Sequence, residues 1–353
     1  MSSSPKQTVQ SVTGPLAATD LGVTLAHEHL LLDGRLGFQE PTEASRLAFA
    51  YRPVSIDILH ELRQNPYGNR DNCGLYDEDA AAEEVAQFAR YGGKTVMEAT
   101  CLGIGRDPLA LRRVSVRTGL NVIMGTGFYL QRTHPAVVGE SSVDELADMM
   151  MADLDDGVGD AKIRAGYIGE LGTGSPVHPD EAKVVRAGAQ AQAATGVALS
   201  IHLDGWAREG HHVLDLIEAE GGDLSRTILC HMNPSHHDPD YQHSLADRGA
   251  YLEYDMIGLD YYFANQDAQS PSDEEAAVAI AKLIDHGYVK RILLSQDVFL
   301  KMMLTRYGGN GYAHIPRHFV PRLRRHDVSE RAIHTMLVTN PAKVLTGITT
   351  DAP

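Results

Sequence analysis

Short runs of apolar residues alternate with longer amphipathic stretches along most of this chain. Eight of the runs have the length and composition of strands that are buried on both faces of a parallel sheet. They cover residues 23–32, 95–101, 122–127, 166–170, 198–202, 227–231, 250–254 and 292–297. Strands that alternate with helices in this number predict an α/β fold, either a closed (β/α)8 TIM barrel or an open, doubly wound sheet.

Helix signals fall between the predicted strands. A helix is expected over residues 78–91, before Gly92 and Gly93, and Pro179 suits the first turn of another helix. Two pairs have the spacing of a capping box, in which a serine and a glutamate satisfy each other's free backbone amides: Ser142 with Glu145, and Ser272 with Glu275.

Two connections are longer than the others. The first, about 33–77, is an insertion after the first strand, and it would lie over the mouth of a barrel. The second, about 299–321, contains the glycine-rich stretch 307–312. We interpret this stretch as a turn or a lid, because no lysine and helix follow it as in a phosphate-binding loop. We expect residues 1–353 to form a single barrel domain with these two long loops.

The charge of the chain restricts the class of partner. It contains 31 basic and 47 acidic residues, which gives a formal net charge of -16. Nucleic acids and anionic membranes require a basic surface, so neither is an expected partner. The expected partner is a small-molecule substrate.

The cysteines and the absence of targeting signals indicate a cytoplasmic protein. Cys73, Cys101 and Cys230 are an odd number without paired spacing, which does not suggest a disulfide framework. Residues 1–6 lack the apolar core of a signal peptide, and no apolar run reaches the roughly 18 residues of a membrane span.

Metal-ligand residue types stand at or near the carboxyl ends of five predicted strands. His27 and His29 are two residues apart, so they face the same side only in an extended strand. The other candidates are Glu170, His202, His231 and Asp297. They can meet at one point only if the first and last strands are neighbours, which favours a closed barrel. The pattern predicts a binuclear metal site. Histidine and carboxylate ligands favour Zn²⁺, with Mn²⁺, Co²⁺ or Ni²⁺ as alternatives.

These residues also give the chain a resemblance to a known family. Together with Gly169-Glu170-Leu171-Gly172 and Asn340-Pro341-Ala342, they resemble the phosphotriesterase-related branch of the amidohydrolase superfamily over nearly the whole chain. The resemblance implies that one metal is held by His27, His29 and Asp297, and the other by His202 and His231. Glu170 would be the bridge, where phosphotriesterases proper have a carbamylated lysine. This resembles the phosphotriesterase-homology subgroup.

The resemblance further implies a hydrolase and a homodimer. A hydroxide that bridges two metals would attack the acyl carbon of a lactone or a carboxylic ester, with Asp297 and Glu170 as catalytic residues and Asp297 moving the proton. N-acyl amide hydrolysis is the alternative, and phosphotriester hydrolysis would be a side reaction. Two other classes are a non-catalytic small-molecule-binding barrel and a metal-free barrel enzyme. Competent residues at all six ligand positions disfavour the binding protein.

Substrate contacts are expected from loops that follow the strands. The candidates are Tyr129, Asn233, Tyr254, Arg306 and Tyr312, with Glu98, Cys101, Asp255 and Tyr307 also above the metals. A phosphorylated substrate would need a fixed cation, and Lys301 and Arg306 are the candidates in the last loop. We expect His211 and His212 to face solvent.

Overall fold

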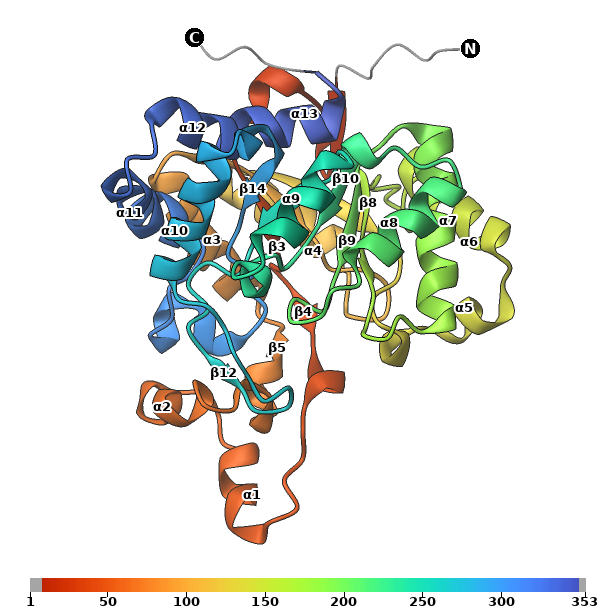
Figure 1. The fold of residues 1–353 in the computed structure, drawn as a ribbon. Helices are drawn as coiled ribbons and strands as arrows, with labels where there is room; N and C mark the ends of the chain where they lie inside the picture. Colours follow the sequence, from red (N-terminus) through yellow and green to blue (C-terminus); the bar gives the residue numbers. More distant parts are fainter. Residues whose placement is uncertain (1–7, 349–353) are drawn as a thin grey trace.

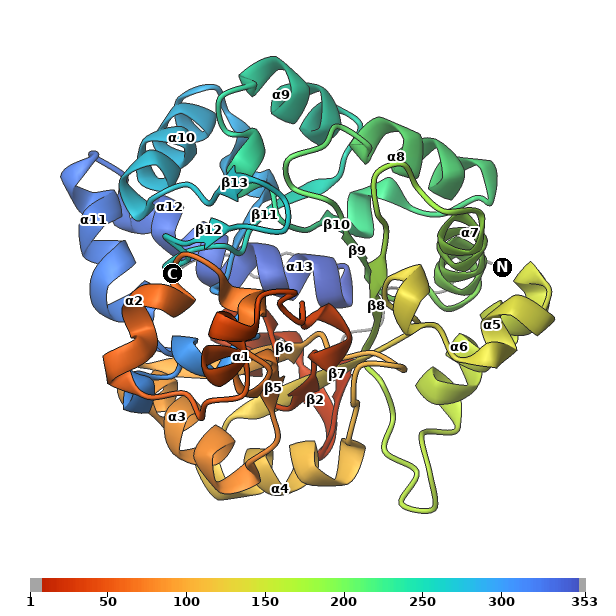
Figure 2. The same ribbon diagram turned by 90° about the horizontal axis from the view of Figure 1, so that it is seen from below.

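The computed structural model describes residues 8–348, and its centre is a parallel sheet of eight strands in the order β14-β11-β10-β9-β8-β7-β6-β3. The strands are β3 (Val23–Glu28), β6 (Gly93–Glu98), β7 (Asn121–Thr126), β8 (Tyr167–Gly172), β9 (Leu199–His202), β10 (Thr227–Leu229), β11 (Tyr251–Tyr254) and β14 (Ile292–Leu294). Helices surround the strands on the outside (Figures 1 and 2). The predicted TIM barrel is confirmed.

The outer helices are α3 (Glu78–Arg90), α4 (Pro108–Thr118), α5 (Ala136–Glu140), α6 (Val143–Asp155), α7 (Pro179–Thr195), α8 (Gly210–Ala219), α9 (Pro239–Asp247) and α10 (Asp273–Asp285). Four of them, α3, α6, α7 and α10, begin where the sequence signals place them. Both predicted capping boxes are formed, at the starts of α6 and α10. Helix α7 also begins with a capping box, from His178 and Glu181, which the sequence analysis did not predict because histidine is not a usual capping residue.

Alternation along the strands divides the core into two layers. Side chains such as Met97, Ile123 and Tyr251 fill the inside of the barrel, whereas their neighbours pack outward against the helices. Both layers are buried, as the continuous apolar runs require.

Hydrogen bonds between β3 and the segment after β14 close the ring. The backbone N–H of His27 donates to Ser295 Oγ at 3.0 Å, and the N–H of Asp297 donates to the His27 carbonyl at 3.3 Å. The buried carboxylate of Glu28 accepts hydrogen bonds from the Ser295 hydroxyl and from the backbone N–H groups of Gln296 and Val298. The first and last strands are therefore neighbours, as the ligand positions required.

Several strands end earlier than predicted. Strand β3 ends at Glu28, so His29 lies just beyond it. Strand β10 ends at Leu229 and β14 ends at Leu294, so His231 and Asp297 lie in the turns that follow. Both residues have left-handed backbone conformations, with φ of 59° and 49°. These turns aim the two side chains at the barrel axis in a way that a continuing strand would not.

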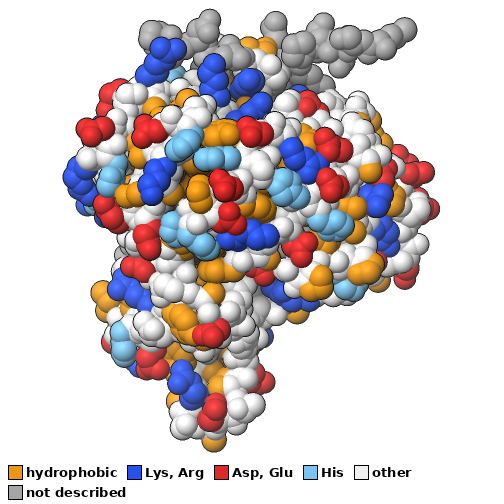
Figure 3. Space-filling model, in the orientation of Figure 1, with side chains coloured by type: hydrophobic (Ala, Val, Ile, Leu, Met, Phe, Trp, Pro, Cys, Tyr) orange, Lys and Arg blue, Asp and Glu red, His pale blue; other side chains and the backbone are white. Residues whose placement is uncertain are grey.

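The two ends of the barrel differ. A hairpin of β1 (Thr8–Ser11) and β2 (Gly14–Ala17) and the helix α13 (Asn340–Thr346) cover the end where the strands begin (Figure 1). The insertion projects from the opposite end (Figures 1 and 3). It contains α1 (Ala44–Ala50) and α2 (Leu59–Leu62), between the paired short strands β4 (Leu32–Asp33) and β5 (Gly74–Leu75).

The remaining segments lie in or after the last loops. A small hairpin of β12 (Tyr262–Phe263) and β13 (Ala268–Gln269) follows β11. The long loop after β14 folds into short helical turns, Lys301–Met303, Thr305–Tyr307 and Ile315–Phe319, before α11 (Val320–Arg325), α12 (Glu330–His334) and the turn Thr335–Thr339. In residues 8–348, no helix has the length and hydropathy of a membrane span. Residues 1–6, which carry the signal-peptide prediction, lie outside the described residues, as do both ends of the predicted domain.

Candidate metal centre and active site

Six side chains meet at the carboxyl ends of five strands, where the sequence analysis places them. Three of them, His29, His231 and Asp297, lie just beyond the strands. We call His27, His29 and Asp297 the inner half, after the first of the two ligand sets that the resemblance implies. His202 and His231 form the outer half, and His202 is the most exposed ligand candidate at 16%. In the inner half, Asp297 Oδ1 lies 3.6 Å from His27 Nε2 and 3.4 Å from His29 Nε2. In the outer half, His202 Nδ1 lies 2.7 Å from His231 Nε2.

Glu170 lies between the two halves. Its Oε1 is 3.3 Å from His29 Nε2, whereas its Oε2 is 3.2 Å from His202 Nδ1 and 3.8 Å from His231 Nε2. One carboxylate therefore presents an oxygen to each half, which is the arrangement that a bridging ligand requires.

The donor set fits a divalent cation. Two buried atoms, His27 Nε2 and Asp297 Oδ1, have no hydrogen-bond partner among the described residues. Ligand atoms of His27, His29 and Asp297 lie within 4.8 Å of one another, and so do those of His27, Glu170 and His231. A buried polar atom without a partner is costly, and a metal ion would satisfy both atoms at once.

The electrostatics of the site link metal binding to proton release. Burial opposes the charged form of His231, yet nearby Asp255 raises its pKa to about 10. Burial likewise opposes ionisation of Glu170, but the charge of His27 holds the pKa of this carboxyl well below its ordinary value. Since ligation requires neutral imidazole, a metal ion binding here displaces protons from the histidines whose pKa is raised, which are His27, His29 and His231.

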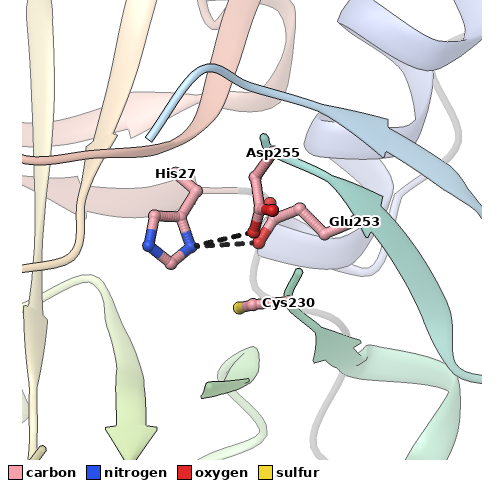
Figure 4. A group of neighbouring side chains, drawn as sticks. All are labelled: His27, Cys230, Glu253 and Asp255. Atoms are coloured by element: carbon pink, nitrogen blue, oxygen red, sulfur yellow. Dashed lines mark hydrogen bonds and ion pairs between the residues drawn. The ribbon is translucent and has the colours of Figure 1, made fainter. Parts of the chain in front are cut away.

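Figure 4 shows the support behind His27. Its Nδ1 lies 3.2 Å from Glu253 Oε2 and 3.6 Å from Asp255 Oδ2, while its Nε2 faces Glu170. Cys230, Glu253 and Asp255 could themselves hold a metal with His27. Burial, however, raises the pKa of the Cys230 thiol well above its ordinary value, so this group favours a supporting role. A carboxylate on one imidazole nitrogen fixes the tautomer and leaves the other nitrogen free to bind metal.

His29 has a different support. Its Nδ1 lies 2.9 Å from the hydroxyl of Thr100, which in turn lies 2.6 Å from Glu98 Oε1. Both Thr100 and Glu98 are fully buried at the end of β6. This chain of contacts fixes the ring of His29 with Nε2 toward the site.

The outer half is supported less evenly. Asp255 holds His231 at two points, with Oδ1 3.1 Å from Nδ1 and 3.0 Å from the backbone N–H. His202 is contacted by the hydroxyl of Tyr129, which lies 3.2 Å from Nδ1 and 3.4 Å from Nε2. Among the described residues, the only carboxylate within ion-pair distance of His202 is Glu170, which also faces the inner half. His202 has no second carboxylate there of the kind that Asp255 gives to His231.

A cavity of about 570 Å³ opens directly above the metal-ligand candidates. His29, Glu170, His202, His231 and Asp297 form part of its lining. Residues from the insertion and from the loops after β7, β9, β11 and β14 complete the wall, including Phe38, Tyr67, Tyr129, Trp206, Met256, Phe263 and Phe299. This volume accommodates a small organic molecule in contact with the centre.

Only one of the five predicted substrate contacts, Tyr129, lines this cavity. Tyr254 points outward from β11, because side chains alternate along a strand, and its hydroxyl donates to Gln242 on α9. The side-chain oxygen of Asn233 accepts the backbone N–H of Met256.

The remaining two predicted contacts also have partners outside the cavity. Arg306 pairs with Glu83, and the hydroxyl of Tyr312 donates to the His29 carbonyl. Of the further candidates, Glu98 and Asp255 lie behind the histidines rather than above them. Cys101 is fully buried, with its thiol 3.0 Å from the Glu170 carbonyl. Tyr307 lines a separate, smaller cavity of about 120 Å³.

The sequence analysis missed several residues near the site. Glu253 lies on β11 two residues before Asp255, which follows the strand, so alternation could have identified it. Thr100 and Arg132, by contrast, belong to loops, and no local pattern marks them.

Comparisons with known proteins agree with this geometry. A model of the phosphotriesterase family matches residues 7–345. An N-acetyltaurine hydrolase of Tetraodon nigroviridis is 36% identical over 341 residues, which cover 96% of this chain and 97% of the relative. The crystal structure of a resiniferatoxin-binding protein from Rhodobacter sphaeroides is 50% identical, with a TM-score of 0.96 and coverage of 98% of this chain and 97% of that one.

A third similar protein is the phosphotriesterase homology protein of Escherichia coli, solved with phosphate in its active site. It is 29% identical, with a TM-score of 0.74, and the match covers 92% of this chain and 98% of that one. The family match spans nearly the whole chain, and the relatives cover nearly all of it. The chain therefore belongs to the phosphotriesterase family of hydrolases.

Proposed function

We propose that this protein uses two divalent metal ions, with zinc as the first choice, to hydrolyse the acyl bond of a small carboxylic acid derivative. One observation carries the proposal. Six metal-ligand side chains converge beneath a cavity of about 570 Å³, and five of them line it. Two of their buried ligand atoms lack any other partner among the described residues. The donors, two pairs of histidines and two carboxylates without a thiolate, suit zinc.

The chemistry divides between the ions and the protein. When bound, such ions act as Lewis acids and make water a nucleophile at neutral pH. Asp297 is the residue we assign to proton transfer, because its carboxylate lies at the cavity floor with Oδ1 free of hydrogen bonds to the described residues. It would take a proton from the attacking water and deliver it to the leaving group. Glu170 would keep the two halves at a fixed separation, because its carboxylate has one oxygen facing each half.

An N-acyl amide is our first candidate for the substrate, with a lactone or a carboxylic ester second. The order follows from relatives named N-acetyltaurine hydrolase, which match this chain at 36% identity over 96% of its length. Amides, lactones and esters all have an acyl carbon that water can attack, so the same catalytic residues could act on all three. In the cavity, the Tyr129 hydroxyl is placed to donate a hydrogen bond to the substrate.

A non-catalytic binding function is the second candidate. The relative at 50% identity is named for binding resiniferatoxin, and the cavity here has an extensive aromatic lining. Turnover separates the two functions, because a binding protein would retain a ligand unchanged.

Initial rates on a substrate panel test the proposal. The zinc- or manganese-loaded protein would be assayed with N-acyl amides, lactones, carboxylic esters and one activated phosphotriester, following acid or amine release. We expect one acyl class to be preferred over the phosphotriester by at least about a hundredfold in kcat/KM, which corresponds to about 2.7 kcal/mol. A fully metallated protein that turns over none of them would favour the binding function.

A further inference from the structure

The cavity above the metal-ligand candidates has an arginine in its wall. Among the residues that line it, Arg132 is the sole lysine or arginine. It lies in the short helical turn Gln131–Thr133, three residues after Tyr129 in the loop that follows β7. The loop thus brings an aromatic hydroxyl and a guanidinium group to the same cavity.

The charge of Arg132 is not neutralised by a neighbour in the part of the chain that the structure describes. No carboxylate there lies within ion-pair distance of its guanidinium. The two cations that the sequence analysis considered for a substrate phosphate are paired instead, Lys301 with Asp71 and Arg306 with Glu83. Arg132 is therefore available to a ligand, and they are not.

The backbone that carries Arg132 is held firmly. Buried Glu181 at the start of α7 accepts the N–H groups of Gln131 and Gly174, both at 2.9 Å. His134 Nε2 lies 2.7 Å from the Tyr129 carbonyl, and the Thr133 hydroxyl donates to the Leu130 carbonyl at 2.8 Å. A fixed loop reduces the entropy that is lost when a ligand binds.

Arg132 lines the same cavity as Tyr129 and the ligand candidate His202. The Tyr129 hydroxyl itself is 3.2 Å from His202 Nδ1. A molecule of a size that fits the cavity can therefore contact Arg132 and the centre together.

Aromatic side chains supply a contrasting surface in the same cavity. Trp206 packs edge-on against Phe263 with ring centres 5.7 Å apart, and Tyr67 lies between Phe263 and Phe299 at 6.2 Å and 6.3 Å. These rings come from the insertion and from three different loops. They suit an uncharged, apolar part of a ligand.

We infer that Arg132 binds an anionic group, a sulfonate, carboxylate or phosphate, that the substrate carries away from its scissile acyl bond. The inference rests on the proposed acyl-bond hydrolysis and names its substrate class as acyl compounds with one acidic group. Arginine suits such an anion because its planar guanidinium donates paired hydrogen bonds to the oxygens. The aromatic residues would contact the uncharged remainder.

Matched pairs of compounds test this inference. One pair is N-acetyl-2-aminoethanesulfonate with its neutral sulfonamide, and the others replace the sulfonate by a carboxylate with its carboxamide, or by a phosphonate with its dimethyl ester. Hydrolysis rates and calorimetric binding would be measured on metal-loaded wild-type protein and on Arg132→Gln, Arg132→Lys and Arg331→Gln. Arg331 is an exposed arginine on α12 that does not line the cavity, so its variant is the matched control.

We expect wild-type protein to prefer the anionic member of at least one pair by tenfold or more in kcat/KM. Arg132→Gln should remove this preference mainly by raising KM for the anionic compound, and kcat/KM for the neutral compound should stay within about twofold of wild type. Arg132→Lys, which keeps the positive charge, should recover part of the preference. Equal losses for both members, or no preference in wild-type protein, would overturn the inference. The pair with the largest Arg132-dependent preference identifies the anion.

Binding separates this inference from the proposed function. If wild-type protein hydrolyses no compound but binds the anionic members at least tenfold more tightly, and Arg132→Gln abolishes the difference, the acyl-hydrolase proposal fails and the anion site stands. If hydrolysis occurs with equal efficiency for both members, the hydrolase proposal stands and the anion site fails.

Discussion

The two halves of the candidate metal centre differ in the contacts that support their histidines. In the inner half, the rings of His27 and His29 are each fixed from behind, by Glu253 and by Thr100. In the outer half, Asp255 fixes His231, whereas His202 contacts Glu170 and the hydroxyl of Tyr129 in the cavity wall. A ligand that has a cavity residue in place of a second carboxylate can adjust when substrate enters. The contrast suggests a rigid inner site and an outer site that adapts to the substrate.

Complete removal of metal is the strongest test of this contrast. Dialysis against a chelator should abolish hydrolysis, and zinc should restore it. Since the outer half is the less supported, its ion should leave first, giving two kinetic phases of metal release with the activity lost in the first. Metal content by mass spectrometry during the dialysis follows both phases. Release of both ions in one phase would remove the distinction between the halves.

Glu170→Gln should have the next largest effect, because one carboxylate serves both halves. Removal of this buried charge leaves the surrounding histidines without their counter-charge, and we expect the free energy of unfolding to fall by about 3–5 kcal/mol. Metal occupancy and kcat/KM should fall together, by at least about a hundredfold for the rate. Metal analysis after gel filtration, paired with initial rates, measures this. Two tightly retained ions in the variant would contradict the bridging role.

Asp297→Asn should slow turnover more than it weakens substrate binding. We expect kcat to fall by about 10²-fold or more, as for loss of a general acid or base, with KM changing by a few-fold at most. Steady-state kinetics on protein with verified metal content tests this. An unchanged kcat would remove Asp297 from proton transfer.

Glu253→Ala addresses the inner half alone. Removing the carboxylate behind His27 should weaken metal binding by about 10- to 100-fold. Glu253→Gln, which keeps an oxygen for the His27 N–H, should recover part of that loss. Tyr129→Phe is the matched change in the outer half, and it should leave the slow phase of metal release unaltered. If both variants weaken the same phase, the assignment of supports to halves is wrong.

His211→Ala should have almost no effect on activity or metal content, and it is the control with the smallest expected change. His211 is partly exposed on α8, where its Nε2 lies 2.8 Å from the Ser244 hydroxyl, and it does not line the cavity. We expect activity and metal content within about twofold of wild type. A larger loss would show that the helical ring, as well as the strand ends, controls the centre.

The sequence predicts the barrel and the convergence of its ligand candidates because both depend on local patterns. Buried strands show as apolar runs, and His27 with His29 shows as an i, i+2 pair at the end of one of them. The turns at His231 and Asp297 were not predicted, since a left-handed residue after a strand has no clear signature outside glycine. The predicted ligand residues are nevertheless close together, because both turns lie directly after the strand ends.

The cavity wall was harder to predict. Tyr254 was a candidate contact, but strand alternation turns it outward and turns Glu253 inward. Arg132 had no signal at all, because its place in the cavity depends on how Glu181 anchors the loop. Substrate contacts come from loops whose paths are decided by such distant partners, so periodicity does not reveal them.

Glu28 has a consequence for how the protein matures. Its carboxylate receives the Ser295 hydroxyl and the backbone of Gln296 and Val298, which lie 267 to 270 positions further along the chain. The inner half therefore cannot be assembled by a growing polypeptide until the last barrel strand has been synthesised and has docked. Contacts at such sequence separation form late in folding. Loading of the inner ion would then report that synthesis is finished and that the barrel has closed.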